Sequence, residues 1–298
     1  MKIAIVGATG LVGKMVAKVL TEQGIHAEYT LFNTLGGAEV EINGKTYITQ
    51  ALNEDEATAG TFDYVFFCAE KELSQKYSPF FAEMGSIVID NSSAFRRDPY
   101  TPLIVPECNA QELKNNPQII ANPNCTTIGA VVALKPLDDM FKLKRVVFSS
   151  YQAISGAGAN PKFIHPIENN LITHIDGEEE KMVFETQKIL GRKDIKISAT
   201  CIRVPVKNCH TISVNATFKK RVNIDAVKAA LASAPGVILL PDDELPMPII
   251  ADGRDDVFVG RVRIDESCPK TINMITVLDN VRKGAATNAV QILKCLMS

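Results

Sequence analysis

The chain has 298 residues, of which 46% are hydrophobic and 22% are charged, and its net charge is −2. This length predicts two domains of ordinary size, and the composition excludes a disordered, collagen-like or low-complexity chain. The small net charge produces no global field that would attract nucleic acid or an anionic membrane. Any anion must therefore be bound by a local site.

The cysteine and hydrophobic patterns indicate a soluble, cytoplasmic protein. The seven cysteines are scattered and form no C-x-x-C pair, so neither a disulfide framework nor a zinc site is expected. No apolar run reaches the roughly 18 residues that a membrane-crossing helix needs. The apolar start of the chain breaks at Gly7 and continues as an amphipathic segment, unlike a signal peptide.

The first half of the chain alternates strands with helices. A short apolar run at residues 3–6 predicts a buried parallel strand, and residues 11–22 have the spacing of a helix. Asn43-Gly44 predicts a hairpin turn. Further strands are predicted at 64–68, 86–89 and 119–121, with a helix at 73–84. The alternation is typical of a doubly wound α/β domain.

After about residue 144 the predicted strands become longer and alternate apolar with polar residues, which indicates a mixed or antiparallel sheet with one exposed face. These strands lie at 145–151, 195–206 and 211–219. Helices are predicted at 178–190, at 224–234 with Asn223 as its N-cap, and at 286–297. The domain boundary is expected near Cys125.

A glycine-containing turn, Gly7-Ala8-Thr9-Gly10-Leu11-Val12-Gly13, joins the first strand to the first helix. Such a turn lets the backbone approach a pyrophosphate, which the helix N-terminal amides stabilise. The same pattern also suits a tight turn packed against a helix, but its place at the start of the chain favours a dinucleotide site. No acidic residue follows about 20 positions later, so NAD and NADP both remain open.

Cys125 lies in the segment Asn122-Pro123-Asn124-Cys125-Thr126, where a strand and a turn precede a predicted helix. Helix N-terminal amides stabilise a thiolate and lower the pKa of a thiol, so Cys125 is a candidate nucleophile. A small buried residue at a helix start is the alternative, and placement alone does not decide between them.

A nucleophilic thiol needs a base, and the histidines are His26, His165, His174 and His210. His210 follows a polar and basic turn between two strands, from which an imidazole can face a site. An exposed loop histidine is the simpler interpretation of that pattern. A metal pair of Cys209 and His210 is not expected, because no further ligand follows at a usable spacing. No metal site is predicted.

Several charged residues occur near the ends of predicted elements. Arg96 follows a strand, Arg203 lies on one, and Glu178 and Lys181 share one face of a helix. Arginine can bind a carboxylate or phosphate through paired donors. A solvated ion pair is the alternative for Glu178 and Lys181. The strand that ends near residue 152 leads into a glycine-rich turn at 155–158, which is either a plain turn or a surface for a flat cofactor ring.

Together these segments resemble the aspartate-semialdehyde dehydrogenase family over nearly the whole chain. The matching motifs occur in family order: GATGLVG, SSAFRRD, VPECN, NPNCTT, YQAISGAG, EEEKMVFETQKIL, RVPVKNCH, VGRVRID and DNVRKGAATNAVQI. The cysteine segment, the SGAG turn and the segment from arginine to histidine are jointly very specific.

The resemblance implies NADPH-dependent reductive dephosphorylation of L-aspartyl 4-phosphate to L-aspartate 4-semialdehyde, a step in making lysine, threonine and methionine. It implies that Cys125 forms a thioester, that His210 acts as acid and base, and that Gln152 positions the acyl group. Arg203 and Glu178 match the groups that bind the carboxylate and amine of the substrate, and Asn124 lines the nucleophile turn. The implied phosphate site comprises Arg96 and Lys181.

The resemblance also implies where the cofactor binds. The implied residues are Gly7, Thr9, Gly10, Leu11 and Val12 at the pyrophosphate turn, and Ser155, Gly156 and Asn280 on the nicotinamide side. Family members commonly bind the 2′-phosphate of NADP through an arginine-containing loop. Alignment on Gly37 places Thr34 at that arginine. NADP is the cofactor that the resemblance implies, and because Thr34 replaces this arginine, NAD or dual use is the alternative.

The resemblance completes the predicted architecture: an NADP-binding domain at residues 1–124, joined by the C-terminal helix 279–298, and a catalytic and dimerisation domain at 125–278. Homodimers are usual in the family, so a homodimer is expected. The chain is shorter than many relatives around 165–177 and 236–247, and a homotetramer is therefore the alternative. The partners are a small-molecule substrate and inorganic phosphate. An enzyme like N-acetyl-glutamyl-phosphate reductase and a non-catalytic dinucleotide-binding paralogue are the competing functions, and the presence of Glu178 and Arg203 argues against the first.

Overall fold

The computed structural model describes residues 1–158 and 166–297, and His165 lies outside these residues. The chain forms two compact units. The first comprises Met1–Pro123 and Ala285–Ser298, and the second comprises Asn124–Gly284. None of the helices in the described ranges combines the length and hydropathy that crossing a bilayer requires.

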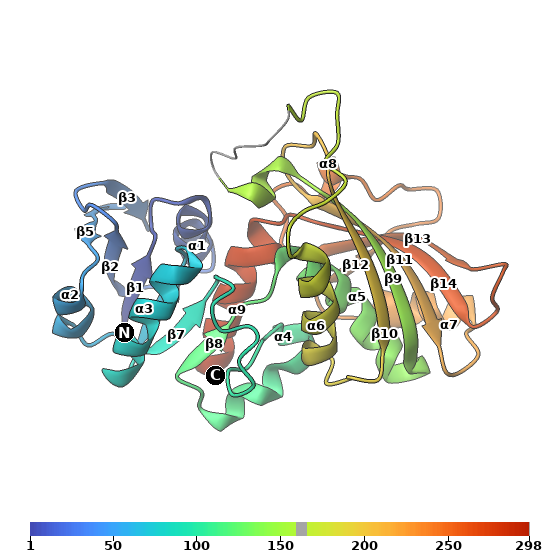
Figure 1. Cartoon of the computed structure of the whole chain (residues 1–298), viewed down its shortest axis with the longest axis horizontal. Helices are drawn as coiled ribbons and strands as arrows, with labels where there is room; N and C mark the ends of the chain where they lie inside the picture. Colours follow the sequence, from blue (N-terminus) through green and yellow to red (C-terminus); the bar gives the residue numbers. More distant parts are fainter. Residues whose placement is uncertain (159–165, 298) are drawn as a thin grey trace. The chain divides into compact units, whose positions relative to one another are not determined.

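The first unit contains a parallel sheet in the order β5-β2-β1-β6-β7-β8 (Figure 1). Its strands are β1 (Lys2–Val6), β2 (Glu28–Asn33), β5 (Gln50–Ala51), β6 (Tyr64–Phe67), β7 (Ile87–Asp90) and β8 (Ile119–Ala121). All neighbouring pairs run parallel. The central strands β1 and β6 are mostly apolar and buried, as expected for a sheet with both faces covered. The predicted Rossmann-like domain is confirmed.

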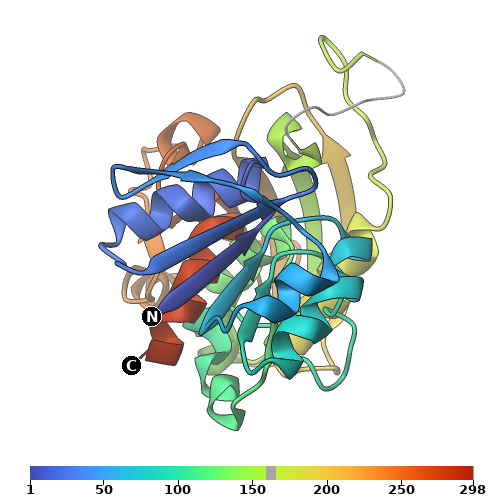
Figure 2. The ribbon, with the colours of Figure 1, turned by 90° about the vertical axis from the view of Figure 1, so that its left-hand side faces the viewer.

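Helices cover both faces of this sheet. α1 (Leu11–Glu22) and α9 (Thr287–Met297) share a hydrophobic core with Ile3 and Ile5, while α2 (Glu54–Ala59) and α3 (Lys71–Glu83) pack on the face of Ala4 and Val6. Figure 2 shows α1 and α3 on opposite sides of the strands. α9 follows a π-helical turn at Arg282–Ala286. It belongs to the first unit, although it comes after the second unit in the sequence.

The predicted hairpin turn is confirmed between β3 (Glu39–Ile42) and β4 (Lys45–Ile48), which pair antiparallel. Asn43 and Gly44 both have positive φ, 54° and 72°, as the tight hairpin turn requires. A short helix α4 (Pro106–Asn109) and a 3₁₀ helix at Ala110–Asn115 follow later in this unit. Neither was predicted.

The second unit contains a mixed sheet in the order β10-β9-β11-β14-β13-β12. Its strands are β9 (Leu143–Gln152), β10 (Lys196–Arg203), β11 (His210–Phe218), β12 (Val237–Leu239), β13 (Val257–Ile264) and β14 (Thr271–Leu278). β9, β11, β14 and β13 pair antiparallel in succession, while β10 and β12 join the sheet edges in parallel. This confirms the predicted mixed sheet.

One face of the mixed sheet is covered by helices. α5 (Cys125–Phe141) packs on β11, α6 (Glu178–Ile189) on β10, and α7 (Ile224–Ala232) on β12. Along β11, buried Ile212 and Val214 alternate with half-exposed residues, as predicted for a strand with one covered face. Asn223 accepts hydrogen bonds from the amides of Asp225 and Ala226, which confirms the predicted N-cap of α7. The short elements of this unit are α8 (Pro248–Ala251) and a 3₁₀ helix at Ile154–Ala157.

Candidate active site

Cys125 is the first residue of α5, and the turn before it is fixed by its neighbour. The side-chain Oδ1 of Asn124 accepts hydrogen bonds from the amides of Thr126 and Thr127, at 2.9 and 3.4 Å. Asn124 is therefore the N-cap of a 17-residue helix. The half-buried Cys125 lies at the positive end of the helix dipole, where a thiolate is stabilised.

His210 is fully buried, and its Nε2 lies 3.2 Å from Sγ of Cys125. The backbone amide of Ala153 donates a hydrogen bond of 3.0 Å to Nδ1 of His210. Since a backbone amide can only donate, Nδ1 accepts, and the neutral ring holds its proton at Nε2. Burial, and then the positive charge of Arg203, lower the pKa of His210 to about 3. The imidazole is therefore neutral near pH 7.

The turn before His210 is held by a hydrogen-bond network. Cys209 has a φ of 73°, which is unusual for a residue with a side chain, and its amide donates to Oδ1 of Asn280 at 2.9 Å. Asn280 Nδ2 donates to Oγ of Ser155, and Ser155 Oγ donates to Oδ1 of Asn208. Ser155 and Asn280, both predicted on the nicotinamide side, thus belong to the structure that positions the imidazole.

Three sheet positions bring further site residues together. Arg203 is the last residue of β10 and pairs with Gln152, the last residue of β9, while His210 is the first residue of the antiparallel β11. Arg203 is buried, and its Nη1 donates to the carbonyl of Ala153 at 2.7 Å. Burial lowers the pKa of Arg203, and the negative charges of Cys125 and Glu178 partly offset this.

Glu178, the first residue of α6, is only 8% exposed. Its carboxylate accepts hydrogen bonds from Lys181 Nζ at 2.7 Å, Asn124 Nδ2 at 2.9 Å and Gln152 Nε2 at 3.2 Å. Burial raises the pKa of Glu178, but the charge of Lys181 and these hydrogen bonds outweigh it and hold the pKa below its usual range. A fully solvated ion pair, which helical spacing allows, is therefore wrong, because Glu178 is buried while the side chain of Lys181 is 30% exposed.

Two glycines approach the reactive groups too closely for any side chain. A Cβ at Gly156 would lie 2.7 Å from Nη1 of Arg203 and 2.8 Å from Cε1 of His210. A Cβ at Gly284 would lie 2.8 Å from Cβ of Cys125. Gly284 therefore shapes the surroundings of the sulfur, a role that its position in the DNVRKGAATN segment did not reveal.

The structure thus brings Cys125, Gln152, Glu178, Arg203 and His210 together in the second unit, and we call these five residues the cysteine cluster. Asn124 and Lys181 contact its carboxylate. Arg96 lies instead in the first unit, where its Nη2 donates to the carbonyl of Asn91 at 2.9 Å. Sequence reasoning did not identify Ala153, Asn208, Glu185 or Gly284.

The glycine turn of the first unit lies beside a cavity of about 330 Å³. Gly7 has a φ of 79°, and a Cβ there would lie 2.5 Å from the carbonyl oxygen of Cys68. Gly10 precedes α1 and makes no side-chain cap, so the first-turn amides of α1 are available to an anion. These features fit the pyrophosphate of a dinucleotide.

The residues lining this cavity match part of the predicted cofactor site. They are Val6, Gly7, Thr9, Gly10, Asn33, Thr34, Leu52, Cys68, Ala69, Leu73 and Tyr77. Leu11 and Val12 form the first turn of α1. Among the lining residues in the described part of the chain there is no lysine, arginine, aspartate or glutamate, so the end of β2 presents the neutral side chains of Asn33 and Thr34.

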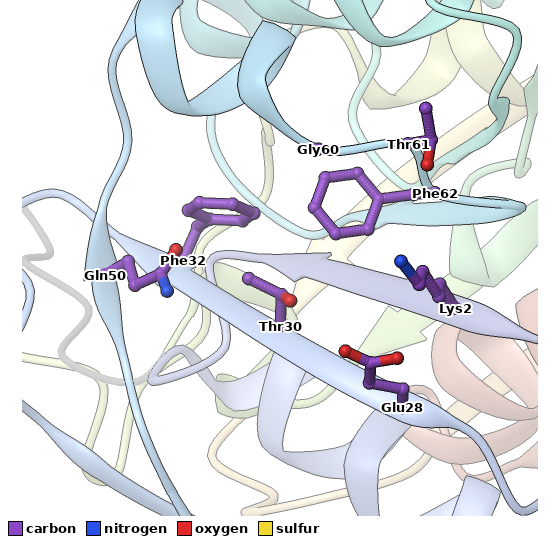
Figure 3. Close-up of a pocket in the computed structure, with 8 residues that line it drawn as sticks. All are labelled: Lys2, Glu28, Thr30, Phe32, Gln50, Gly60, Thr61 and Phe62. Atoms are coloured by element: carbon purple, nitrogen blue, oxygen red, sulfur yellow. The ribbon is translucent and has the colours of Figure 1, made fainter.

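A second cavity of the first unit, of about 230 Å³, is lined by strand residues and a loop (Figure 3). Phe32 and Phe62 meet edge to face across it, with ring centroids 6.1 Å apart. Lys2, Glu28 and Thr30 come from β1 and β2. None of the predicted site residues lines this cavity.

Cys209 has neighbours that its sequence spacing did not indicate. The ligand atoms of Cys209, Asp252 and Asp279 lie within 4.8 Å of one another, because the end of β14 and the residue after α8 meet the turn before β11. The expectation that no further ligands approach Cys209 is therefore wrong. Asn208 Nδ2 donates to both carboxylates, at 2.6 and 3.0 Å, and the amide of Gly253 also donates to Asp279. Hydrogen bonds from these donors explain why the two carboxylates lie together, so we assign no metal to the cluster.

Comparison with known proteins identifies the family. Residues 2–116 match the model of the semialdehyde dehydrogenase NAD binding domain, and residues 134–283 match that of the semialdehyde dehydrogenase dimerisation domain. The aspartate-semialdehyde dehydrogenase of Aquifex aeolicus is 42% identical over 99% of this chain and 98% of its own length. The chain belongs to the aspartate-semialdehyde dehydrogenase family. The aspartate-semialdehyde dehydrogenase of Campylobacter jejuni is also similar, with 41% identity over 98% of this chain and 96% of its own length.

Solved structures of family members agree with this assignment. Aspartate semialdehyde dehydrogenase II of Vibrio cholerae, complexed with ASA, has a TM-score of 0.94 and 38% identity, covering 99% of this chain and 98% of its own. The aspartate semialdehyde dehydrogenase of Candida albicans with NADP has a TM-score of 0.84 and 25% identity over 99% and 98% of the two chains. The resemblance found in the sequence is confirmed. The protein is an oxidoreductase that acts on an aldehyde or oxo group and uses a nicotinamide dinucleotide.

Proposed function

We propose that this protein reduces L-aspartyl 4-phosphate to L-aspartate 4-semialdehyde and phosphate through a thioester on Cys125. The observation that carries this proposal is the 3.2 Å separation between Sγ of Cys125 and Nε2 of His210 at the N-terminus of α5. The names of relatives that align over nearly the whole chain support the substrate.

Cys125 attacks the acyl carbon as a thiolate, the carbon–sulfur bond forms, and phosphate leaves with the electrons of the carbon–oxygen bond. The amides at the start of α5 and the charge of Arg203 favour the thiolate. Gln152 lies in the same cluster, where it donates to Glu178, and it positions the acyl group. The thioester makes a carboxyl-level carbon accept hydride.

His210 acts through the proton that it holds at Nε2. In the resting enzyme this proton faces the sulfur, and in the tetrahedral states it can stabilise the negative oxygen. When the tetrahedral thiohemiacetal collapses, the carbon–sulfur bond breaks and the electron pair returns to Cys125. The neutral imidazole can donate in each of these states because its pKa is about 3.

The two ends of the amino acid are bound by opposite charges. Arg203 is proposed to bind the α-carboxylate, and the ionised Glu178 the α-ammonium group, with Asn124 beside it. This arrangement favours an unblocked amino acid over the N-acetylated substrate of the related reductase. Lys181 and Arg96 are proposed to bind the phosphate. Lys181 would share its ammonium between that phosphate and Glu178.

A bound nicotinamide dinucleotide supplies the hydride. We propose NADP as the cofactor, with NAD as an alternative that the neutral residues Asn33 and Thr34 allow. The residues proposed to hold the cofactor are Gly7, Thr9, Gly10, Leu11, Val12, Thr34, Ser155, Gly156 and Asn280. The fit of the glycine turn to a pyrophosphate supports the first part of this set.

The first unit is proposed to bind the cofactor and the second to carry catalysis and dimerisation. A match to the family dimerisation domain supports a homodimer, with a homotetramer as the alternative. Seven free cysteines accord with work in the reducing cytoplasm.

The test is phosphate-dependent reduction of NADP, and separately of NAD, by aspartate semialdehyde. The wild-type protein should show it, and Cys125→Ala should abolish it while leaving cofactor binding intact. Persistent activity in that variant would exclude the covalent mechanism. No activity in the wild type, with cofactor binding retained, would favour a non-catalytic paralogue, and activity only with N-acetyl-glutamate semialdehyde would favour the related reductase.

A further inference from the structure

Helix α6 carries a second buried carboxylate that the proposed mechanism does not use. Glu185 is 0% exposed, and its Oε2 accepts a hydrogen bond of 2.7 Å from the backbone amide of Asn124. Glu178 and Glu185 are seven residues apart, close to two helical turns, so they lie on the same buried face of α6. Both carboxylates contact the residue that precedes the nucleophile.

Asn124 is held at every polar group it possesses. Its Oδ1 caps α5, its Nδ2 donates to Glu178, and its carbonyl accepts from the amide of Ile128 at 3.0 Å. Its backbone amide precedes the helix and is bonded to Glu185 alone among the contacts described. These bonds decide where α5 begins, and therefore where the next residue, Cys125, places its sulfur.

Of the two α6 residues that bond to Asn124, Glu185 lies further from the start of the helix than Glu178. The other polar bonds of Asn124 involve its own helix or Glu178, which also contacts Lys181 and Gln152. Glu185 instead links the body of α6 to the backbone at the start of α5. A carboxylate is also favourable beside the positive end of a helix. The contact thus combines a fixed backbone position with a favourable charge.

We infer that Glu185 is a positioning residue, which holds Cys125 within reach of His210 by accepting the amide hydrogen of Asn124. This role rests on the proposed function of Cys125 as the nucleophile. In this role Glu185 acts on Cys125 through the backbone of its neighbour Asn124.

Two substitutions separate the hydrogen bond from the charge. Glu185→Asp keeps the charge but withdraws the carboxylate by one methylene, and kcat should fall about 10- to 100-fold with KM changed less than about twofold. Glu185→Gln keeps the length and an acceptor oxygen, and its kcat should stay within about threefold of wild type. The control is Glu180→Gln, an exposed residue of the same helix, which should match the wild type.

A second readout does not depend on the substrate. The rate at which iodoacetamide alkylates Cys125 is measured against pH and resolved by peptide mass. In Glu185→Asp the pH midpoint of this rate should rise relative to wild type, whereas Glu185→Gln and Glu180→Gln should keep it. A residue that serves stability alone would lower the thermal midpoint and leave this profile unchanged.

Two outcomes would overturn the inference: wild-type kcat and alkylation in folded Glu185→Asp, or a Glu185→Gln protein as impaired as Glu185→Asp. If neither variant folds, amide exchange in the wild-type protein decides, since a bond to a buried carboxylate must protect the Asn124 amide and rapid exchange would refute it. Activity retained in Cys125→Ala would refute the proposed function instead, while alkylation and exchange would still test the contact.

Discussion

The backbone amide of Ala153 donates a hydrogen bond to Nδ1 of His210 at 3.0 Å. This bond reserves Nδ1 as an acceptor and leaves the ring proton on Nε2, which faces Cys125 at 3.2 Å. The imidazole therefore meets the sulfur as a donor. In the proposed mechanism the thiolate form of Cys125 is favoured by the helix N-terminus and by Arg203 rather than by proton removal by the ring.

The buried imidazole should make stability depend on pH. The pKa of His210 is about 3 in the folded protein, against 6.5 ordinarily, because burial and Arg203 disfavour the charged ring. Between these values the unfolded chain binds a proton that the folded chain does not. The free energy of unfolding should therefore fall as pH drops from 6.5 towards 3, by up to about 1.4 kcal/mol per pH unit from this group.

Denaturant unfolding at several pH values checks this dependence. His210→Gln should flatten the decline relative to wild type, whereas His26→Gln, at an exposed position, should leave it unchanged. Equal slopes in wild type and His210→Gln would show that the ring is protonated in the folded protein.

Gly284→Ala should impair catalysis more than it impairs folding. The added Cβ would meet Cβ of Cys125 at 2.8 Å, so the cysteine or its helix must move, and kcat should fall about 10- to 100-fold. Gly191→Ala is the control, because Gly191 has a φ of 64° and open space around it. The control should lose about 1–2 kcal/mol of stability and keep its kcat. The reverse pattern would mean that the contact at Gly284 relaxes without moving the sulfur.

Cofactor selectivity should respond to a charge at Thr34. The described residues that line the cavity beside the glycine turn provide no cation for a 2′-phosphate. Thr34→Arg should therefore raise the ratio of kcat/KM for NADP over NAD by about 10-fold or more, because hydrogen bonds to a charged group are strong. Leu35→Ala, a neighbour that is 88% exposed, should leave the ratio unchanged. If this ratio is unchanged in Thr34→Arg, the 2′-phosphate does not bind near residue 34.

Thiol alkylation should separate the cysteines by environment. Burial raises the pKa of Cys201 to about 11 and also raises the pKa of Cys68 and Cys209. The hydrogen bond from Thr271 lowers the pKa of Cys268. As pH rises, Cys125 and Cys268 should thus be alkylated before Cys68, Cys201 and Cys209. The products must be resolved by peptide mass, and early labelling of Cys201 would contradict this order.

Long elements with clear periodicity could be predicted from the sequence. Residues 11–22 form α1 with the predicted bounds, and the caps and turns at Asn223 and Asn43-Gly44 are as expected, because each has a local cause. β13 and β14 were not recognised as strands. Short α2 and α4 were missed as well, since four to six residues carry too little pattern.

The site was less accessible to sequence reasoning than the fold. Cys125 and His210 are 85 residues apart, and no local pattern reports that they meet. Only the resemblance to a family joined them. Glu178 and Lys181 have the spacing of a surface ion pair, and the burial of Glu178 follows from the packing of α6 on α5, which helical period alone does not reveal.

The positions of Gln152, Arg203 and His210 at the ends of three adjacent strands limit how this protein can vary. Side chains alternate between the two faces of a strand, so inserting or deleting one residue within β9, β10 or β11 would turn a catalytic group to the opposite face. Insertions and deletions are therefore expected to be tolerated in the connecting loops and not within these strands. The activity should therefore depend on the lengths of these strands as strongly as on the identities of the three residues at their ends.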